Sequence, residues 1–118
     1  SIITQTENSL SFYCDIDNYT ELEAVVPFLA DPNVSVYLAN YNVGYSEQDY
    51  YDMMVFAIGE QAPEAISGST ITFNITVPGR ITSVEGAVQT GDNTIQYSFP
   101  LIDFLLLSSP LSFSVQWV

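Results

Sequence analysis

The chain contains neither lysine nor histidine, and Arg80 is its only basic residue. Its 118 residues include 14 acidic side chains, which give a formal net charge of -13 at pH 7. A surface with one cation cannot neutralise nucleic-acid phosphates, nor is it attracted to anionic lipid headgroups. We therefore expect no nucleic-acid partner and no electrostatic membrane binding by this domain. The acidic balance suits a cationic partner or Ca²⁺, although solubility through self-repulsion is the simpler interpretation.

The missing side chains also remove most familiar catalytic arrangements. Without histidine the chain cannot build a Ser-His-Asp or Cys-His site, and without lysine it cannot form a Ser-Lys dyad or a Schiff base. No glycine-rich phosphate-binding motif is present. Two carboxylates can hydrolyse glycosides, but no motif selects a pair among the 14. The sequence therefore predicts a protein that is not an enzyme and needs no cofactor.

Cys14 is the only cysteine, so the chain has no intrachain disulfide and no multi-cysteine metal site. It alternates on one face with Leu10, Phe12 and Ile16, and a small buried hydrophobic side chain is the expected role. A reactive thiolate would need a cation or an imidazole beside it. We predict that Cys14 has a packing role.

One segment has the beginning of a calcium-binding pattern. Asp15, Asp17 and Asn18 supply alternating oxygen atoms, as the start of an EF-hand loop does. The glycine at the sixth position and the glutamate at the twelfth are missing. A polar turn is therefore favoured, and no metal site is predicted.

Long hydrophobic runs are also absent. The longest apolar stretch, residues 101–107, is interrupted by Asp103 and falls short of the roughly 18 residues that span a bilayer. The first residues do not form a signal peptide, and no change of composition marks a linker. We expect one soluble domain covering residues 1–118, with any signal peptide or membrane anchor outside it.

Two-residue alternation of apolar and polar side chains dominates the sequence and is typical of strands with one buried face. The clearest example is residues 70–77, which a Pro-Gly pair ends. Gly86 is a candidate bulge or bend within 80–88. A turn at 91–93 then joins that segment to 94–99 in a hairpin. Further strands are expected at residues 10–16, 34–38 and 111–117.

Helix signals are fewer. Ser46 and Asp49 form an acidic variant of the capping box, and the apolar spacing that follows predicts a helix over 47–58. A second helix is expected over 21–30, where Pro27 kinks or ends it unless it begins a new turn. The fold class predicted is α+β, an antiparallel sheet of about five or six strands with one or two helices packed on one face.

Tyrosine and methionine concentrate where the helices should meet the sheet. Five of the eight tyrosines lie between residues 37 and 51, and both methionines follow in the helix over 47–58. These side chains either form a packing layer with hydroxyls at its rim or line an apolar groove. The candidate ligand-binding residues are Tyr37, Tyr41, Met53, Met54 and Phe56.

The C-terminal part of the chain has a further pattern, in which an alternating strand ends in Pro-Gly and a basic residue, and an Asn-Thr turn precedes a later strand. The segments concerned are residues 75–87, 91–99 and 110–115. In this pattern residues 71–118 resemble the LppM-like domain of bacterial secreted or membrane-anchored proteins, whose members usually carry tryptophan where Tyr97 stands. The resemblance implies an extracytoplasmic α+β domain without catalytic residues, which binds a lipid or another apolar molecule between helices and sheet.

Together these observations predict a non-enzymatic extracytoplasmic domain of a bacterial envelope or surface protein. It would bind an apolar ligand or a partner between helices and sheet. The expected partners are a hydrophobic small molecule or an envelope protein, with any membrane anchor outside this chain. The alternative is a β-sandwich structural or adhesive module of a larger cell-surface protein.

Overall fold

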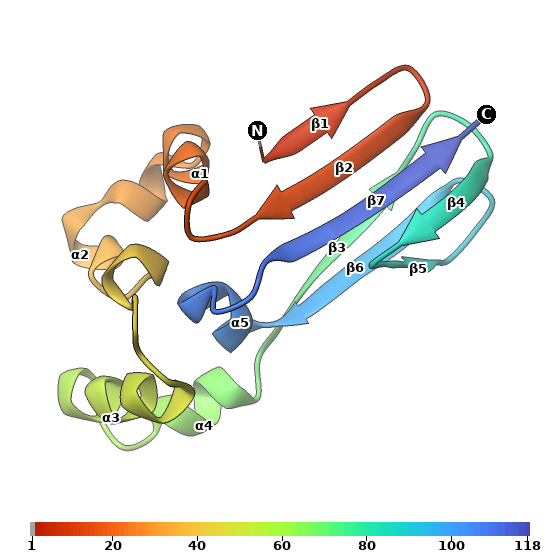
Figure 1. The fold of residues 1–118 in the computed structure, drawn as a ribbon. Coiled ribbons are helices and arrows are strands. Elements are labelled where there is room, and N and C mark those ends of the chain that lie inside the picture. The colour runs from red at the N-terminus through yellow and green to blue at the C-terminus, as the bar shows by residue number, and fades with distance from the viewer. Residues whose placement is uncertain (1) are drawn as a thin grey trace.

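A computed structural model describes residues 2–118, which form two antiparallel sheets with a group of helices at one end (Figure 1). The four-stranded sheet has the order β1 (Ile3–Gln5), β2 (Ser9–Cys14), β7 (Leu111–Trp117) and β4 (Ile81–Glu85). The three-stranded sheet has the order β3 (Thr70–Thr76), β6 (Thr94–Pro100) and β5 (Val88–Gln89). The helical segments are α1 (Tyr19–Val25), η1 (Pro27–Ala30), α2 (Pro32–Ser35), η2 (Ala39–Tyr41), α3 (Glu47–Ala57), α4 (Ala62–Ser67) and α5 (Leu101–Leu106).

The four-stranded sheet joins the two ends of the sequence. β2 pairs antiparallel with β7 in a register that places Phe12 opposite Phe113. In the same register Ser11 lies opposite Ser114, and Tyr13 lies opposite Ser112. Because successive side chains point to opposite faces of a strand, this sheet has one aromatic face and one face rich in serine.

The apolar faces of the two sheets pack on each other through aromatic rings. The ring centroid of Tyr97 in β6 lies 5.8 Å from that of Phe12 and 4.8 Å from that of Phe113. Ile95 and Phe99 alternate with polar residues along β6 and are buried on the same face as Tyr97. The core of the sandwich therefore lies between β6 and the β2–β7 pair.

Gly86 divides the segment 80–88 between the two sheets. Its φ is 79°, and an added Cβ would lie 2.6 Å from the carbonyl oxygen of Ser112. Only glycine adopts this conformation and this approach without strain. The chain leaves β4 at this point and continues as β5 in the other sheet, and β5 pairs with β6. The predicted bend at Gly86 and the predicted hairpin into 94–99 are thus confirmed.

The predicted helix over 21–30 is broken before Pro27. α1 ends at Val25, and Val26 has extended dihedral angles, φ -120° and ψ 86°. The residue before a proline avoids the helical region because the proline ring clashes with its backbone. The helix thus ends before Pro27, as expected, and Pro27 begins the short 3₁₀ helix η1, which is the new turn that the sequence left open.

The prediction of a strand at residues 34–38 is wrong. Residues Pro32–Ser35 form α2, whose first position is a proline. The Asp31 carboxylate accepts a hydrogen bond from the backbone N–H of Asn33 at 2.8 Å. A capping aspartate followed by proline is a strong local signal for a helix start, and it outweighs the alternation of three apolar side chains.

The predicted α+β class with antiparallel strands is confirmed. The strands form two sheets, however, and the helices lie at the end of the sandwich (Figure 1). The physical reason is that each sheet buries its apolar face on the other sheet. The helices accordingly pack where β2 and β6 end, around Tyr19, Tyr50 and Leu105, which are all buried.

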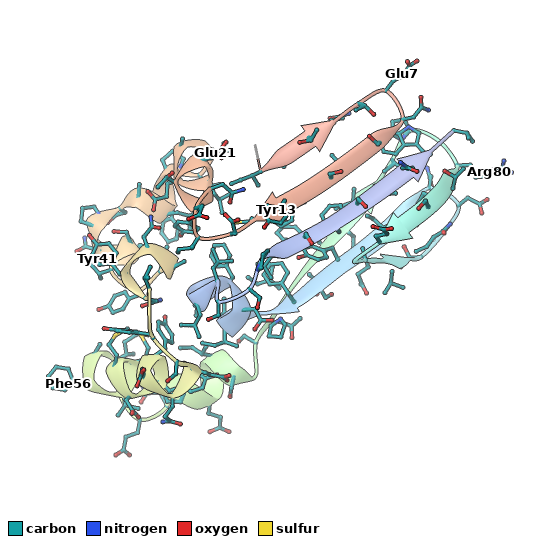
Figure 2. The ribbon with its side chains drawn as sticks, viewed as in Figure 1. Glu7, Tyr13, Glu21, Tyr41, Phe56 and Arg80 are labelled. Carbon is teal, nitrogen blue, oxygen red and sulfur yellow. The ribbon has the colours of Figure 1, made fainter. Side chains whose placement is uncertain are left out.

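The domain is elongated, with principal extents of 50 × 27 × 22 Å. The strands run along the long axis, with α1 to α4 at one end and Arg80 near the other (Figure 2). Among residues 2–118, no helix has both the length and the apolar composition needed to cross a bilayer.

The contact between the sheets yields a stability prediction. Replacing the buried Phe113 with alanine removes the ring that packs on Phe12 and Tyr97, and should lower the free energy of unfolding by about 3–5 kcal/mol. The matched change Phe73→Ala should cost clearly less, because Phe73 is 50% exposed. Urea denaturation at equal m-values measures both. Equal losses in the two variants would contradict the packing described here.

Candidate functional site

The five residues expected to line an apolar groove are dispersed around the helical elements. Met54 is buried, and Tyr37 and Met53 are half-buried against the core. Tyr41 and Phe56 are exposed, and Phe56 reaches 94% exposure (Figure 2). Neither of the two concavities described below is lined by any of these five residues. The three inner residues thus match the packing-layer interpretation, whereas the two outer ones belong to the surface.

Local sequence explains why these residues divide in this way. The Ser46 hydroxyl accepts from the backbone N–H of Asp49 at 3.1 Å, and the Asp49 carboxylate accepts from the N–H of Ser46 at 3.0 Å. This capping box fixes the start and the rotation of α3. Tyr50 and Met54, one turn apart, then face the core. Phe56, two residues further along, must point outward.

A pair of buried polar side chains holds the helices to the sandwich. The Tyr50 hydroxyl donates to the carbonyl oxygen of Tyr37 at 3.0 Å. The Asn42 amide donates to the same carbonyl at 3.2 Å and to the carbonyl of Leu105 at 2.8 Å. These bonds link η2 and α3 to α5, and so they set the position of the Tyr37 and Tyr41 region.

Most of the large apolar side chains that are exposed lie on the helical elements and the segments that join them. We define the helical end as residues 19–68, which includes α1 to α4. Ten of the fifteen large hydrophobic residues that are exposed among residues 2–118 belong to it. They are Val25, Val26, Phe28, Val36, Tyr41, Val43, Tyr45, Val55, Phe56 and Ile58. Such a concentration of exposed apolar side chains usually marks a contact surface.

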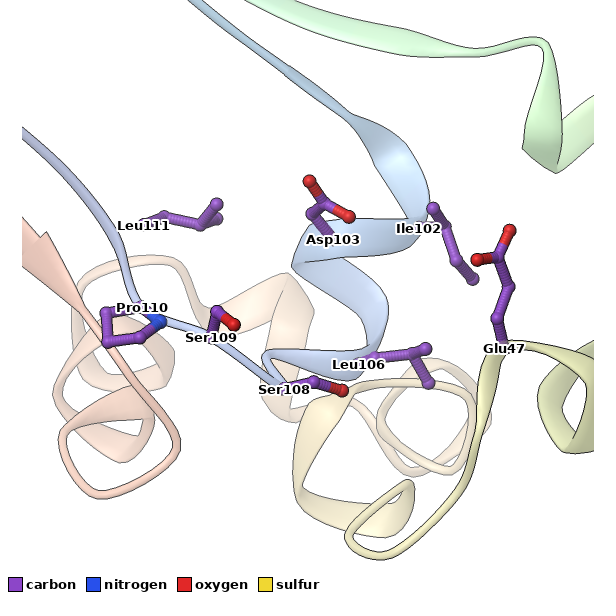
Figure 3. Close-up of a pocket in the computed structure, with 8 residues that line it drawn as sticks. All are labelled: Glu47, Ile102, Asp103, Leu106, Ser108, Ser109, Pro110 and Leu111. Carbon is purple, nitrogen blue, oxygen red and sulfur yellow. The ribbon is translucent and has the colours of Figure 1, made fainter. Parts of the chain in front are cut away.

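The larger concavity, here called the acidic pocket, lies between the start of α3, helix α5 and the start of β7 (Figure 3). Its volume is about 290 Å³. Leu107 ends α5 in the left-handed conformation, φ 47°, and the chain reverses there to line the pocket. The lining residues are Glu47, Ile102, Asp103, Leu106, Ser108, Ser109, Pro110 and Leu111.

The acidic pocket offers two carboxylates, Glu47 and Asp103, and two serine hydroxyls as hydrogen-bonding groups. Glu47 already accepts a hydrogen bond from the Tyr51 hydroxyl at 2.9 Å, and burial together with this bond raises the pKa of Tyr51 to about 12. Figure 3 shows Glu47 and Asp103 on either side of Ile102. Ser108 and Ser109 have no imidazole or amine to activate them, since the chain contains no histidine or lysine. Residues 2–118 contain no group of three or more potential ligands that could hold a metal ion.

The smaller concavity, here called the serine groove, lies on the outer face of the four-stranded sheet. Its volume is about 240 Å³. It is lined by Ser11, Phe12, Tyr13, Glu85, Gly86, Ser112, Phe113 and Ser114. No sequence pattern singles out this group. The alternation of serines in β2 and β7 is visible in the sequence, but the neighbouring position of β4 is not.

Cys14 has the packing role that its alternation predicts. The side chain is fully buried, and burial, with a smaller effect of the neighbouring Asp15 carboxylate, raises the pKa of the thiol to about 11. At neutral pH the thiol is therefore almost entirely protonated. The turn that follows is held by side-chain hydrogen bonds between Asp15 and Asn18, as a polar turn requires.

A scan against family models, a search of curated proteins and a search of solved structures found no match to this chain. The resemblance to the LppM-like domain is accordingly neither supported nor opposed by these comparisons.

Buried tyrosines give this domain a specific alkaline response. Burial raises the pKa of Tyr19 and Tyr50 from 10.0 to about 12. The folded state thus holds these phenol protons more tightly than the unfolded state does. Their contribution to stability is complete below about pH 10 and is lost as the pH rises through about 12.

The Tyr19 hydroxyl has no hydrogen-bond partner among the described residues, whereas the Tyr50 hydroxyl donates to Tyr37. Tyr19→Phe should therefore leave stability at neutral pH unchanged or slightly higher, and should reduce the loss between about pH 10 and 12. Tyr50→Phe should lower stability at neutral pH by about 0.5–1.5 kcal/mol. Urea midpoints across this pH range measure both effects. If Tyr19→Phe is less stable than Tyr50→Phe at neutral pH, the Tyr19 hydroxyl cannot be without a hydrogen-bond partner.

Proposed function

We propose that this chain is a non-enzymatic binding domain of a bacterial envelope protein, which acts outside the cytoplasm. We further propose that its helical end contacts a partner protein whose surface is apolar and basic. The observation that carries this proposal is the gathering of ten exposed hydrophobic side chains on the helical end. A domain of this size gains nothing in stability from exposing Phe56 or Phe28 to water.

The charge of the helical end defines the chemistry of the partner. Eight of the 14 acidic residues lie between Glu21 and Glu64, and this range contains no lysine, arginine or histidine. An anionic membrane surface would be repelled by these carboxylates. A protein surface with apolar side chains and lysine or arginine around them would be complementary in both respects.

The outer faces of the sheets and the resemblance of residues 71–118 to the LppM-like domain support the proposed location. The exposed face of β3 and β6 consists of uncharged side chains, among them Thr72, Asn74, Gln96 and Ser98. Faces rich in hydroxyl groups occur on many proteins of the cell exterior. The lack of catalytic pairings, of lysine and of histidine supports a role in binding.

A synthetic amphipathic helix tests the partner chemistry. A helical peptide with leucine on one face and lysine on the other should bind the domain and perturb amide NMR signals within residues 25–58. Added salt should weaken this binding. A peptide with glutamate in place of each lysine should not bind. Phe56→Ser combined with Phe28→Ser should weaken binding about tenfold or more, since both side chains are exposed apolar contacts.

Val88→Ser is the matched control, because Val88 is similarly exposed but lies on the sandwich. It should leave peptide affinity unchanged. Equal binding of the two peptides, or perturbation spread over both sheets, would contradict the proposed contact.

The location has its own test. In source cells whose outer envelope layers are permeabilised and whose cytoplasmic membrane is intact, the native protein should be degraded by added protease while a cytoplasmic marker protein survives. Protection of the domain until the cells are lysed would refute the proposed location but would leave the peptide result intact.

The alternative of a structural or adhesive module is also supported by one observation. The strands form a two-sheet sandwich, an architecture common in modules of surface proteins. In that role the outer sheet faces would make the contacts instead of the helical end. The peptide experiment separates these roles, because it locates the perturbed residues.

A further inference from the structure

The serine groove exists because β4 stops before β7 does. β4 ends at Glu85, which lies opposite Ser114, and the chain then turns away at Gly86 into the other sheet. The β7 segment around Ser112 and Phe113 therefore loses its neighbour on that side. On the other side β2 continues and places Tyr13 opposite Ser112. The result is a shallow groove of about 240 Å³ across three strands.

The floor of this groove offers hydrogen-bonding groups that the fold does not use. Within residues 2–118 the side chains of Ser11, Ser112, Ser114 and Glu85 take part in no hydrogen bond, and the bond between Tyr97 and Ser112 uses the Ser112 backbone. The outer face of the other sheet differs. There the Thr72 and Ser98 hydroxyls lie 3.0 Å apart, and the Gln96 amide donates to Asn74 at 3.3 Å. Polar side chains thus pair with each other on one face, and those in the groove are available to a ligand.

Tyr13 forms one wall of the groove and presents an aromatic ring that is 45% exposed. The neighbouring Asp15 carboxylate raises the pKa of the Tyr13 hydroxyl. Asp15 is itself fixed, because it accepts from the backbone N–H groups of Asp17 and Asn18 at 2.9 and 3.0 Å. The turn that follows Tyr13 is therefore ordered before any ligand arrives, which reduces the entropy lost on binding.

Glu85 stands on the opposite wall. β2 and β4 flank β7, so Tyr13 and Glu85 are separated by two interstrand spacings, roughly 10 Å in the direction across the strands. This span fits one or two linked sugar rings. A carboxylate accepts hydrogen bonds from adjacent hydroxyls, serines both donate and accept, and an aromatic ring packs on the C–H face of a pyranose.

We propose that the serine groove binds a neutral carbohydrate, with Tyr13 packing on a sugar ring and Glu85, Ser112 and Ser114 holding its hydroxyl groups. Charge decides between classes of ligand. The groove contains one carboxylate and no cation, and the domain carries a net charge of -13, so an anionic ligand is repelled. A fatty chain would leave the carboxylate and three hydroxyls without partners.

The proposal is independent of the contact at the helical end. The groove lies on the sandwich, and residues 19–68 contribute nothing to it. If the domain binds the peptide but no sugar, only the proposed carbohydrate site is wrong. If it binds a sugar but not the peptide, only the proposed protein contact is wrong.

Titration of the whole domain with neutral hexasaccharides of glucose, mannose and N-acetylglucosamine tests the proposal, with hexagalacturonate as the anionic control. At least one neutral saccharide should give saturable amide NMR shifts at millimolar concentration or below, centred on residues 11–13, 85–86 and 112–114. Hexagalacturonate should give none. Tyr13→Ala should weaken binding about tenfold, and Tyr13→Phe should retain most of the affinity because the ring remains.

Glu85→Gln and Ser114→Ala should each weaken binding severalfold, while Thr72→Ala, on the outer face of the other sheet, should have no effect. Unchanged amide spectra outside the groove verify that each variant is folded. The proposal is overturned if no neutral saccharide in the panel produces saturable shifts, if the shifts map elsewhere, or if Tyr13→Ala binds as the original chain does.

Discussion

The packing of Tyr97 on Phe12 and Phe113 is the interaction on which the rest of the structure depends. It brings β6 of one sheet against the paired strands β2 and β7 of the other. Once the apolar faces of both sheets are buried on each other, the helices have no sheet face to cover. They pack at the end of the sandwich, where Asn42 and Tyr50 tie them to α5 and to each other by hydrogen bonds.

This arrangement separates two surfaces of different chemistry. The helical end combines exposed apolar side chains with carboxylates, whereas the outer faces of the sheets carry hydroxyls and amides. The charge of the chain restricts the partners of both surfaces in the same way, because the chain has almost no cations with which to hold an anion. The partner proposed for the helical end is therefore basic, and the ligand proposed for the serine groove is neutral.

Much of the fold was predictable from local patterns. Alternation located β3, β6 and β7 closely, and the capping box at Ser46 located the start of α3. Where local signals competed, the stronger one decided, as at Asp31, where a cap and a proline produced α2 instead of a strand. β1 was not predicted, because a three-residue strand of Ile, Thr and Gln has no pattern of its own and exists by pairing with β2.

Local sequence patterns could not predict which strands share a sheet, because β2 pairs with a strand about a hundred residues away. The serine groove was missed for the same reason. Its walls come from β2 and β4, which become near neighbours only through β7. The five candidate ligand-binding residues share a residue type and a spacing that suit an apolar groove. The rotation of α3, which its cap fixes, nevertheless places Met54 in the core and Phe56 on the surface.

The distribution of charge along the 50 Å axis has one more consequence. Eight carboxylates lie on the helical end, whereas the opposite tip holds fewer acids, Glu7 among them, together with the guanidinium of Arg80 (Figure 2). The domain is therefore an electric dipole as well as a polyanion. Near a negatively charged layer it experiences a torque that turns the Arg80 tip inward and the helices outward, which orients the molecule before any contact forms.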